Sequence, residues 1–517
     1  MSLTRSIGRN TLFTALGRSA VLFVWFLVTP TVLDALGADR FGFWSILLVL
    51  SGTLATLDLG LGVAIMRFVG EIAERGAAGV VFRLVARALA LQVLLAGALA
   101  VLGLLFREPI LEAFHIPAAW TGEARAALTL ALISFVLTVA TNLLVAALQG
   151  LQRMALAALA LGGSAIFLGG VVLVAARQPA PLLALVVAQV AFGALQFVLL
   201  SAALFRAVRG LEVAPQEAIS AGQDALAVRD VSLRKVIRAG SWLQASSVLV
   251  LLQQNVDKIL LGTLVALAPV AAYEIAFRVS SVGLLFPVYF LGALLPVLAR
   301  QQAVVGEAAR LSFYRASLVP YLSLSLAMGG ILFALAPSVL EAWLAVPPEG
   351  SVFMLRCLIV AGVANLATGI ASTVVRATDR MDIEVVYLVA LVLLHLFLSY
   401  AGFRLFGWPG ILYGLVLAGV ATALGFVTRV EAWLGVRPLS EIVPALLPGL
   451  LAAVVAGLSA AGIALLFEGL PQGRARGSLA TAAGGLAYAI AFAGVLAVAF
   501  PVTFRSLAER ARVVLRG

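Results

Sequence analysis

The sequence is poor in the residues on which most enzyme and metal chemistry depends. The 517-residue chain has one cysteine, Cys357, two histidines, His115 and His395, and two lysines, Lys235 and Lys258. The single cysteine excludes an intrachain disulfide, and no Cys, His and carboxylate spacing is typical of a structural metal site. No G-x-x-x-x-G-K-[ST] motif occurs, which argues against a nucleotide-binding P-loop.

Charge is also scarce. Only 11% of the residues are charged, 63% are hydrophobic, and the mean hydropathy is +1.12. A soluble protein of this length could not keep so much apolar surface away from water. Apolar windows of about 20 residues, the length needed to cross a bilayer, recur along the chain. The sequence therefore predicts an all-α polytopic membrane protein.

We expect about 14 transmembrane helices joined by short loops. The predicted spans are roughly 10–36, 41–70, 80–106, 124–148, 153–176, 180–206, 236–264, 270–299, 312–336, 351–375, 382–403, 409–432, 441–467 and 478–504. The first run is too long for the apolar region of a cleavable signal peptide and is expected to be an uncleaved anchor. The longest polar segment, residues 209–235, is too short for a separate catalytic domain.

Basic residues are concentrated in alternate loops, on the side that carries both ends of the chain. The positive-inside rule then predicts that both termini are cytoplasmic. The net charge of +11 is explained by basic residues that set the membrane topology and contact anionic lipid headgroups. It does not indicate nucleic-acid binding, because the basic clusters flank spans and lack interleaved aromatic residues. Ala-rich spans and the use of Arg in place of Lys suggest a bacterial inner (plasma) membrane.

Weak internal similarities suggest a repeat. Gly17 and Gly240 open spans one and seven, and Asn142 and Asn365 lie in spans four and ten at the same offset of 223 residues. Two halves of six spans that enter from the same side would be related by an axis along the membrane normal, with a cavity between them. The expected parts are 1–208 (first six-helix lobe), 209–235 (cytoplasmic linker), 236–436 (second six-helix lobe) and 437–517 (two further helices and a tail).

The segment QQNVDK, residues 253–258, interrupts an apolar span. On a helix, Gln254, Asn255 and Lys258 fall within an arc of about 100°, whereas Asp257 points towards a different neighbour. Spans one and four carry similar polar stripes, with Arg18 and Trp25 on one and Asn142 and Gln149 on the other. A polar stripe facing lipid is costly, so these stripes must face protein or water. They could bond helices together or converge on one cavity.

Three cations are expected inside spans: Arg18, Lys258 and Arg278. Asp58 lies at a depth where it could pair with Arg18, and Glu274 with Arg278 could pair with Lys258 and Asp257 across a short loop. Complete pairing would make these charges structural. Incomplete pairing would leave a cationic site that attracts an anion, and phosphate suits guanidinium geometry. The acids Asp58, Asp257 and Glu274 are then candidates for ion pairing or coupling, and His395 is a candidate proton site or a packing residue.

Several segments resemble a known family. RNTLFTALGRS near the start, TPTVLDALGADRFGFWSILL, LATLDLGLGVAIMRFVGEIAERG, LQGLQRM at 148–154 and NVDKILLGTLVALAPVAAYEIAFRV at 255–279 are similar to the polysaccharide-biosynthesis (Wzx-type) flippases of the multidrug/oligosaccharidyl-lipid/polysaccharide exporter (MOP) superfamily. The resemblance implies two six-helix lobes in a V plus two C-terminal helices. It also implies translocation of a lipid-diphosphate-linked oligosaccharide to the outer leaflet by alternating access.

The resemblance suggests Arg18, Lys258 and Arg278 as candidates for binding the diphosphate. The polar stripes add further substrate-binding candidates: Asn142, Gln149, Gln254, Asn255 and Trp25. The expected partners are a polyprenyl-diphosphate-linked glycan, membrane lipids and a polysaccharide polymerase or ligase, with no nucleic acid. No cofactor is expected, and coupling to a Na⁺ or H⁺ gradient is left open. The alternatives are a multidrug/cation antiporter of the same superfamily and an integral-membrane glycosyltransferase or polymerase.

Overall fold

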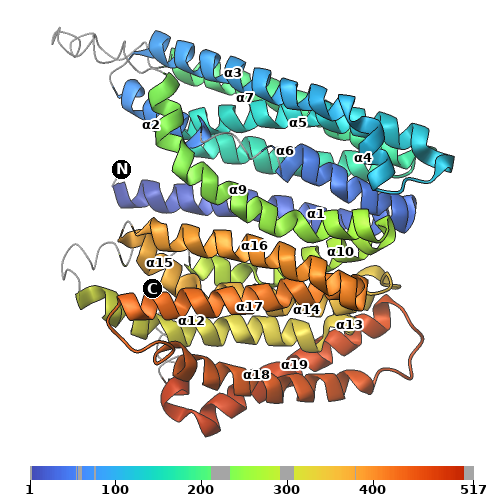
Figure 1. Cartoon of the computed structure of the whole chain (residues 1–517), viewed down its shortest axis with the longest axis vertical. Helices are drawn as coiled ribbons and strands as arrows, with labels where there is room; N and C mark the ends of the chain where they lie inside the picture. The colour runs from blue at the N-terminus through green and yellow to red at the C-terminus, as the bar shows by residue number, and fades with distance from the viewer. Residues whose placement is uncertain are drawn as a thin grey trace. The chain divides into compact units, whose positions relative to one another are not determined.

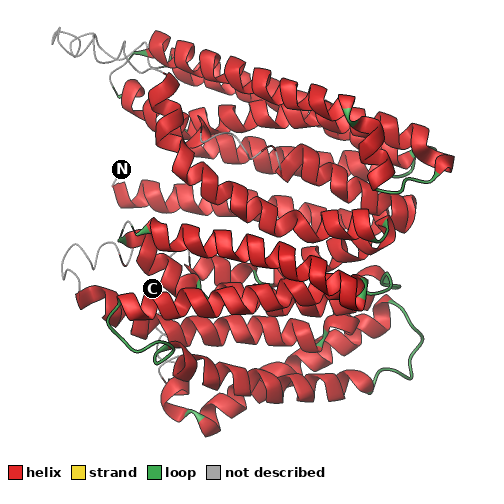
Figure 2. Ribbon diagram, in the orientation of Figure 1, coloured by secondary structure: helices red, strands yellow, loops and turns green. Residues whose placement is uncertain are grey.

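The computed structural model describes residues 3–53, 55, 61–74, 77–210, 233–291, 298, 308–378 and 380–505; the side chains of residues 3–22 and 233–247 and of a few single positions lie outside that description. All the regular structure in these residues is helical, with no strand among them (Figure 2). The predicted all-α class is confirmed.

Within the described residues, nine helices are long and apolar enough to cross a membrane, or ten if the bent pair Leu267–Gly283 and Leu285–Leu291 forms one span. Their outer surfaces are apolar. In Ala78–Leu105 only 17% of the most apolar stretch is buried, and Leu94 and Leu105 are 70% and 74% exposed. Such surfaces are stable in lipid and not in water, so the chain is a multi-pass membrane protein.

The chain divides into two compact units, Met1–Asn255 with Gly262–Ala271, and Val256–Leu261 with Ala272–Gly517. The four-part division expected from the sequence stays a prediction. The first unit contains α1 (Leu3–Leu48), the π-helical turn η1 (Val49–Thr53), α2 (Leu61–Ala73), α3 (Ala78–Leu105), α4 (Arg107–Ala113), the 3₁₀ turn η3 (Ala118–Trp120), α5 (Thr121–Gly150), α6 (Met154–Ala175), α7 (Pro181–Arg209) and most of α9 (Leu233–Leu264) (Figure 1).

Inside the first unit, α2 packs between α3 and α5. Leu61, Ile65 and Val69 of α2 meet Leu143 and Leu148 of α5 in one buried cluster. The long helix α1 breaks at Gly37, whose φ of 69° and ψ of 171° are not helical. Glycine reaches positive φ without steric cost, and the break falls between the predicted spans 10–36 and 41–70.

The second unit contains the remaining helices. They are α10 from Ala272 onward (whole helix Leu267–Gly283), α12 (Ala308–Ala334), α13 (Ala336–Leu344), α14 (Ser351–Ala367), α15 (Gly369–Ala377), α16 (Met381–Phe406), α17 (Trp408–Trp433), α18 (Ile442–Leu465) and α19 (Arg474–Ala499) (Figure 1). Its core brings Tyr314, Leu318 and Tyr321 of α12 against Ile370 and Val374 of α15. A smaller cluster joins Leu335 to Tyr488 of α19 and to small residues of α18.

Helices α16 and α17 run side by side at very short range. A side chain at Gly410 would overlap the carbonyl of Gly402, and one at Gly414 would overlap the backbone at Ser399. Ser399 Oγ donates to the carbonyl oxygen of Ile411 at 2.9 Å. Small residues permit this approach, which supplies packing energy where lipid provides no hydrophobic drive. The contact fixes α16, which carries His395.

We predict that Gly410→Ala lowers the thermal unfolding midpoint in detergent, because the new methyl group has no space and overpacking costs about 1–3 kcal/mol. Gly425, on the same helix, is the matched control. A side chain there meets no atom within 4 Å, so Gly425→Ala is expected to leave the midpoint unchanged or to raise it, since alanine favours helix. Equal midpoints for the two variants would contradict the close packing.

Candidate functional site

Two cations share one carboxylate where α9 meets α10. Lys258 Nζ lies 2.7 Å from Glu274 Oε2, and Arg278 Nε lies 2.7 Å from Glu274 Oε1. The ammonium group also lies 4.9 Å from the centre of the Phe277 ring, an arrangement that adds a cation–π attraction. The three charged side chains are only 7–11% exposed.

The local sequence explains this meeting. Helix α9 ends at Leu264 and α10 begins at Leu267, so the short link makes the two helices antiparallel neighbours. Lys258, near the end of α9, therefore faces Glu274, early in α10. Glu274 and Arg278 are four residues apart and share one helix face.

The three side chains together carry a formal charge of +1. Buried charges are stable only when they are paired and hydrogen-bonded. The arrangement can hold an anion on both cations at once, as Glu274 itself does.

A second polar cluster involves the residues that immediately precede Lys258 and Glu274 on the same two helices. Tyr273 Oη donates to Asp257 Oδ2 at 2.9 Å, and His395 Nε2 of α16 lies 2.9 Å from Asp257 Oδ1. Asp257 and His395 are fully buried. His395 Nδ1 is buried and makes no hydrogen bond within the described part of the chain. A carboxylate and an imidazole in direct contact can hold or release a proton.

The sequence suggested Lys258 and Asp257 as partners for Glu274 and Arg278. In the structure Glu274 accepts from both cations, and Asp257 instead contacts Tyr273 and His395. Sequence reasoning missed Tyr273, which looks like an ordinary buried aromatic residue. The distance of 138 residues between Asp257 and His395 left no local pattern that could reveal their contact.

The other candidates on α9 are not part of this cluster. Gln254 is exposed. Asn255 is buried, and its Nδ2 donates to the carbonyl oxygen of Leu251 in its own helix at 2.8 Å. The side chain of Arg18, and Asp58, lie outside the described residues.

Three candidates lie in the first unit. Asn142 Nδ2 on α5 donates to the carbonyl oxygen of Ala55 at 3.2 Å. Trp25 on α1 packs against Trp44, with ring centres 5.6 Å apart. Gln149 is half-buried near the end of α5. Asn142 and Trp25 thus contribute to packing within this unit, and their role towards a substrate stays a prediction.

In the residues described, no group of three or more His, Cys, Asp or Glu side chains could hold a metal ion. The charged and polar side chains described above can form ion pairs and hydrogen bonds and can exchange protons.

The fold is a multi-pass helical bundle with buried ion pairs. Several solved structures share this fold. "Lipid II flippase MurJ, inward closed conformation" has a TM-score of 0.62 at 11% identity, over 94% of this chain and 98% of that one. An inward-facing multidrug-resistance MATE family transporter of the MOP superfamily has a TM-score of 0.58 at 15% identity, over 82% and 94%. A MATE transporter of Vibrio cholerae, VcmN, has a TM-score of 0.58 at 12% identity, over 83% and 97%.

At these identities the likeness concerns the fold alone. The family is shown by the sequence itself, since the model of the polysaccharide biosynthesis protein family matches residues 7–302. The chain belongs to that family, on the fold of the MOP transporters and flippases. No curated protein sequence matches it.

We predict strong coupling between Lys258 and Glu274. In a double-mutant cycle with Lys258→Met and Glu274→Gln, measured by denaturant unfolding in micelles, the coupling free energy should be about 1–3 kcal/mol, because Glu274→Gln takes the carboxylate away from the buried ammonium group and Lys258→Met takes one of its cations away from the buried carboxylate. The exposed pair Arg67–Glu71, whose side chains are 69% and 49% exposed, is the matched control and should give about 0.5 kcal/mol or less. Equal coupling in the two pairs would contradict a buried, mutually dependent cluster.

Proposed function

We propose that this protein is a flippase that moves a lipid-diphosphate-linked oligosaccharide from the cytoplasmic to the outer leaflet by alternating access. The observation that carries the proposal is the pair of cations on one carboxylate, Lys258 and Arg278 on Glu274, in a buried part of a membrane protein. Membership of the polysaccharide biosynthesis family supports a glycan as the cargo.

In this mechanism Glu274 occupies the place of the substrate's diphosphate. Its two oxygens each lie 2.7 Å from one cation, and a phosphate oxygen could replace either. A diphosphate has a larger charge than a carboxylate, so it would compete for both cations. Release of Glu274 would accompany substrate binding, and its return would help to expel the product.

The barrier to flipping is the desolvation of phosphate and sugar hydroxyls in hydrocarbon. A cationic, hydrogen-bonding site replaces water around the head while the polyprenyl tail stays in lipid. We place the protein in the bacterial inner membrane with both termini in the cytoplasm, and we retain Arg18 as a further diphosphate ligand with Asp58 as its acid. Asn142, Gln149 and Trp25 are retained as glycan contacts.

A multidrug antiporter has the same fold, as the MATE structures illustrate. Such a protein would bind organic cations, which the positive charge on Lys258 and Arg278 would repel. Drug-resistance assays in an expressing cell distinguish this alternative from the flippase.

We predict that Lys258→Gln and Arg278→Gln each abolish display of the surface glycan in the native host while the protein remains at a normal level in the membrane. The loss follows from removing one of two charges that bind the diphosphate. Arg404→Gln, at an exposed cation near the end of α16, is the control and should leave display intact. Normal display in both single variants, with both proteins present, would contradict the assignment.

We further propose that Asp257 and His395 form the coupling site and that the coupling ion is a proton. With a neutral imidazole and an ionised Asp257 the pair has one negative charge, which is costly inside a membrane span. A proton on Nδ1, the atom with no hydrogen bond to a described residue, would turn the pair into an ion pair of zero net charge. The surrounding titratable groups are Tyr273, the Cys357 thiol, and the neighbouring Lys258 and Glu274.

This assignment predicts that His395→Asn removes stimulation of flipping by a pH gradient in proteoliposomes, because asparagine can donate to Asp257 but cannot take up a proton. In the wild type the gradient should change the flipping rate by about tenfold. This fold-change is within the range that is typical of coupling between two sites. Proton flux is followed with a pH-sensitive dye inside the vesicles. Undiminished pH-driven flux in His395→Asn, or dependence on Na⁺ alone, would contradict the proton site.

A further inference from the structure

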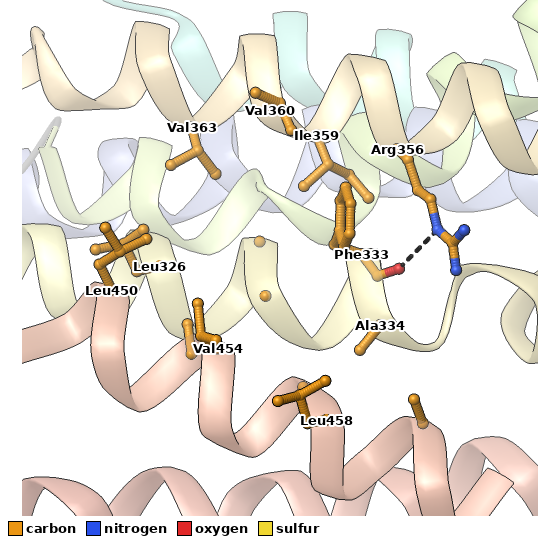
Figure 3. A pocket seen from close by; sticks show the side chains of 15 residues that line it. Leu326, Phe333, Ala334, Arg356, Ile359, Val360, Val363, Leu450, Val454 and Leu458 are labelled. Carbon is orange, nitrogen blue, oxygen red and sulfur yellow. Dashed lines mark hydrogen bonds between the residues drawn. The ribbon is translucent and has the colours of Figure 1, made fainter.

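An apolar groove lies between α12, α14 and α18 in the second unit, well removed along the chain from the charged cluster. Its cavity volume is about 450 Å³, within the range of sites for small organic ligands. Figure 3 shows it bounded by the side chains of Leu326, Phe333, Ile359, Val363, Val454 and Leu458. Val454 and Leu458 are 53% and 71% exposed, so the groove opens on the outer surface of α18, where lipid is the solvent.

A single cation lies at one end of this groove. Arg356 Nε donates to the carbonyl oxygen of Phe333 at 3.3 Å (Figure 3), and the guanidinium lies 5.3 Å from the centre of the Phe333 ring. The two Nη atoms make no hydrogen bond to any residue that the structure describes. Arg356 lies five residues from the start of α14 at Ser351, a rise of about 7.5 Å. Arginine near the end of a membrane-spanning helix can extend its guanidinium group to the lipid phosphates.

Beyond Arg356 the groove continues into a polar pocket of about 200 Å³, which Arg356 also lines. Glu341 and Arg476 form a bidentate pair there, with Nε–Oε1 at 2.8 Å and Nη2–Oε2 at 2.9 Å, and so cancel each other's charge. Glu468 lines the same pocket. It is exposed, and it makes no salt bridge within 4 Å of a described residue, although its charge also attracts Arg476. Along this line the surface is apolar, then positive at Arg356, then negative at Glu468.

We infer that this surface binds one membrane phospholipid whose zwitterionic headgroup ends in a primary ammonium group. An acyl chain would lie in the groove, the phosphate would accept hydrogen bonds from the Nη atoms of Arg356, and the ammonium group would pair with Glu468. The order of the three features matches the order of chain, phosphate and amine in such a lipid. A diphosphate-linked lipid fits less well, because it adds negative charge close to the carboxylate of Glu468.

The test is native mass spectrometry of the full-length protein with phosphatidylethanolamine, phosphatidylcholine and phosphatidylglycerol of identical acyl chains. We expect phosphatidylethanolamine to bind about tenfold more tightly than the other two, since only its headgroup combines a positive charge with N–H donors for Glu468. Choline has no N–H donor, and glycerol has no positive charge.

Four variants separate the parts of the site. Arg356→Gln should weaken all three lipids by about tenfold, with partial recovery in Arg356→Lys. Glu468→Gln, at an exposed position that cannot affect folding strongly, should remove the preference for phosphatidylethanolamine and leave phosphatidylglycerol binding unchanged. Val454→Trp should weaken all three lipids by filling the groove.

The matched control is Arg404→Gln. Arg404 lies near the end of α16, at the same end of the unit as Arg356, since the rings of Phe353 and Trp408 are 5.7 Å apart. It does not line either pocket, so lipid binding should be unchanged. Thermal midpoints without added lipid check that each variant is folded.

Three results would overturn the inference. The first is wild-type binding of phosphatidylglycerol equal to or tighter than that of phosphatidylethanolamine. The second is unaltered binding in a folded Arg356→Gln. The third is displacement of phosphatidylethanolamine by a polyprenyl diphosphate in a way that depends on Arg356, which would make the groove part of the substrate's route. None of these results bears on whether Lys258 and Arg278 bind a diphosphate.

Discussion

The ion pairs of Glu274 with Lys258 and Arg278 are the interactions that most constrain the packing of α9 and α10. Lipid surrounds the helices with a medium as apolar as their own side chains, so apolar contact does little to bring helices together. A buried charge without a partner is far more costly than a missing methyl contact. The register of α9 against α10 is therefore set by one carboxylate that two cations require.

Because of this constraint, two sites share one turn of α9 and one turn of α10. Lys258 and Glu274 form the first site, and the residues just before them, Asp257 and Tyr273, form the second with His395. A movement of α9 that takes Lys258 away from Glu274 also moves Asp257, because Asp257 and Lys258 are adjacent on the same helix. If both proposed sites bind their ligands, a ligand at one site would alter the affinity of the other by a reciprocal free energy. In this proposal, adjacent residues of α9 couple proton binding to anion binding, and no longer pathway is required.

How much of this could be predicted from the sequence depends on the range of each interaction. The spans follow from composition, and the contact of Lys258 with Glu274 was within reach because a short link forces α9 and α10 together. His395 could be recognised as unusual, but its partner is on a helix whose neighbours no local pattern specifies. From the sequence alone, Arg356 is one of many basic residues near the end of a predicted span. Its significance lies in the apolar groove on one side and Glu468 on the other, and only the packing of α12, α14 and α18 brings these features together.

The last two helices are apolar, and they pack against α12 and α13. The surface beside them is not uniformly apolar. Glu341 of α13 ties down the start of α19 through Arg476 and the backbone N–H of Gly473, which places the loop between α18 and α19, with Glu468, beside Arg356. Without these charged residues, the two apolar helices would present lipid tails with a uniform apolar surface. The fixed loop places Glu468 in the same pocket as Arg356 of α14. If this surface binds the lipid we infer, the composition of the bilayer would affect the stability of the protein.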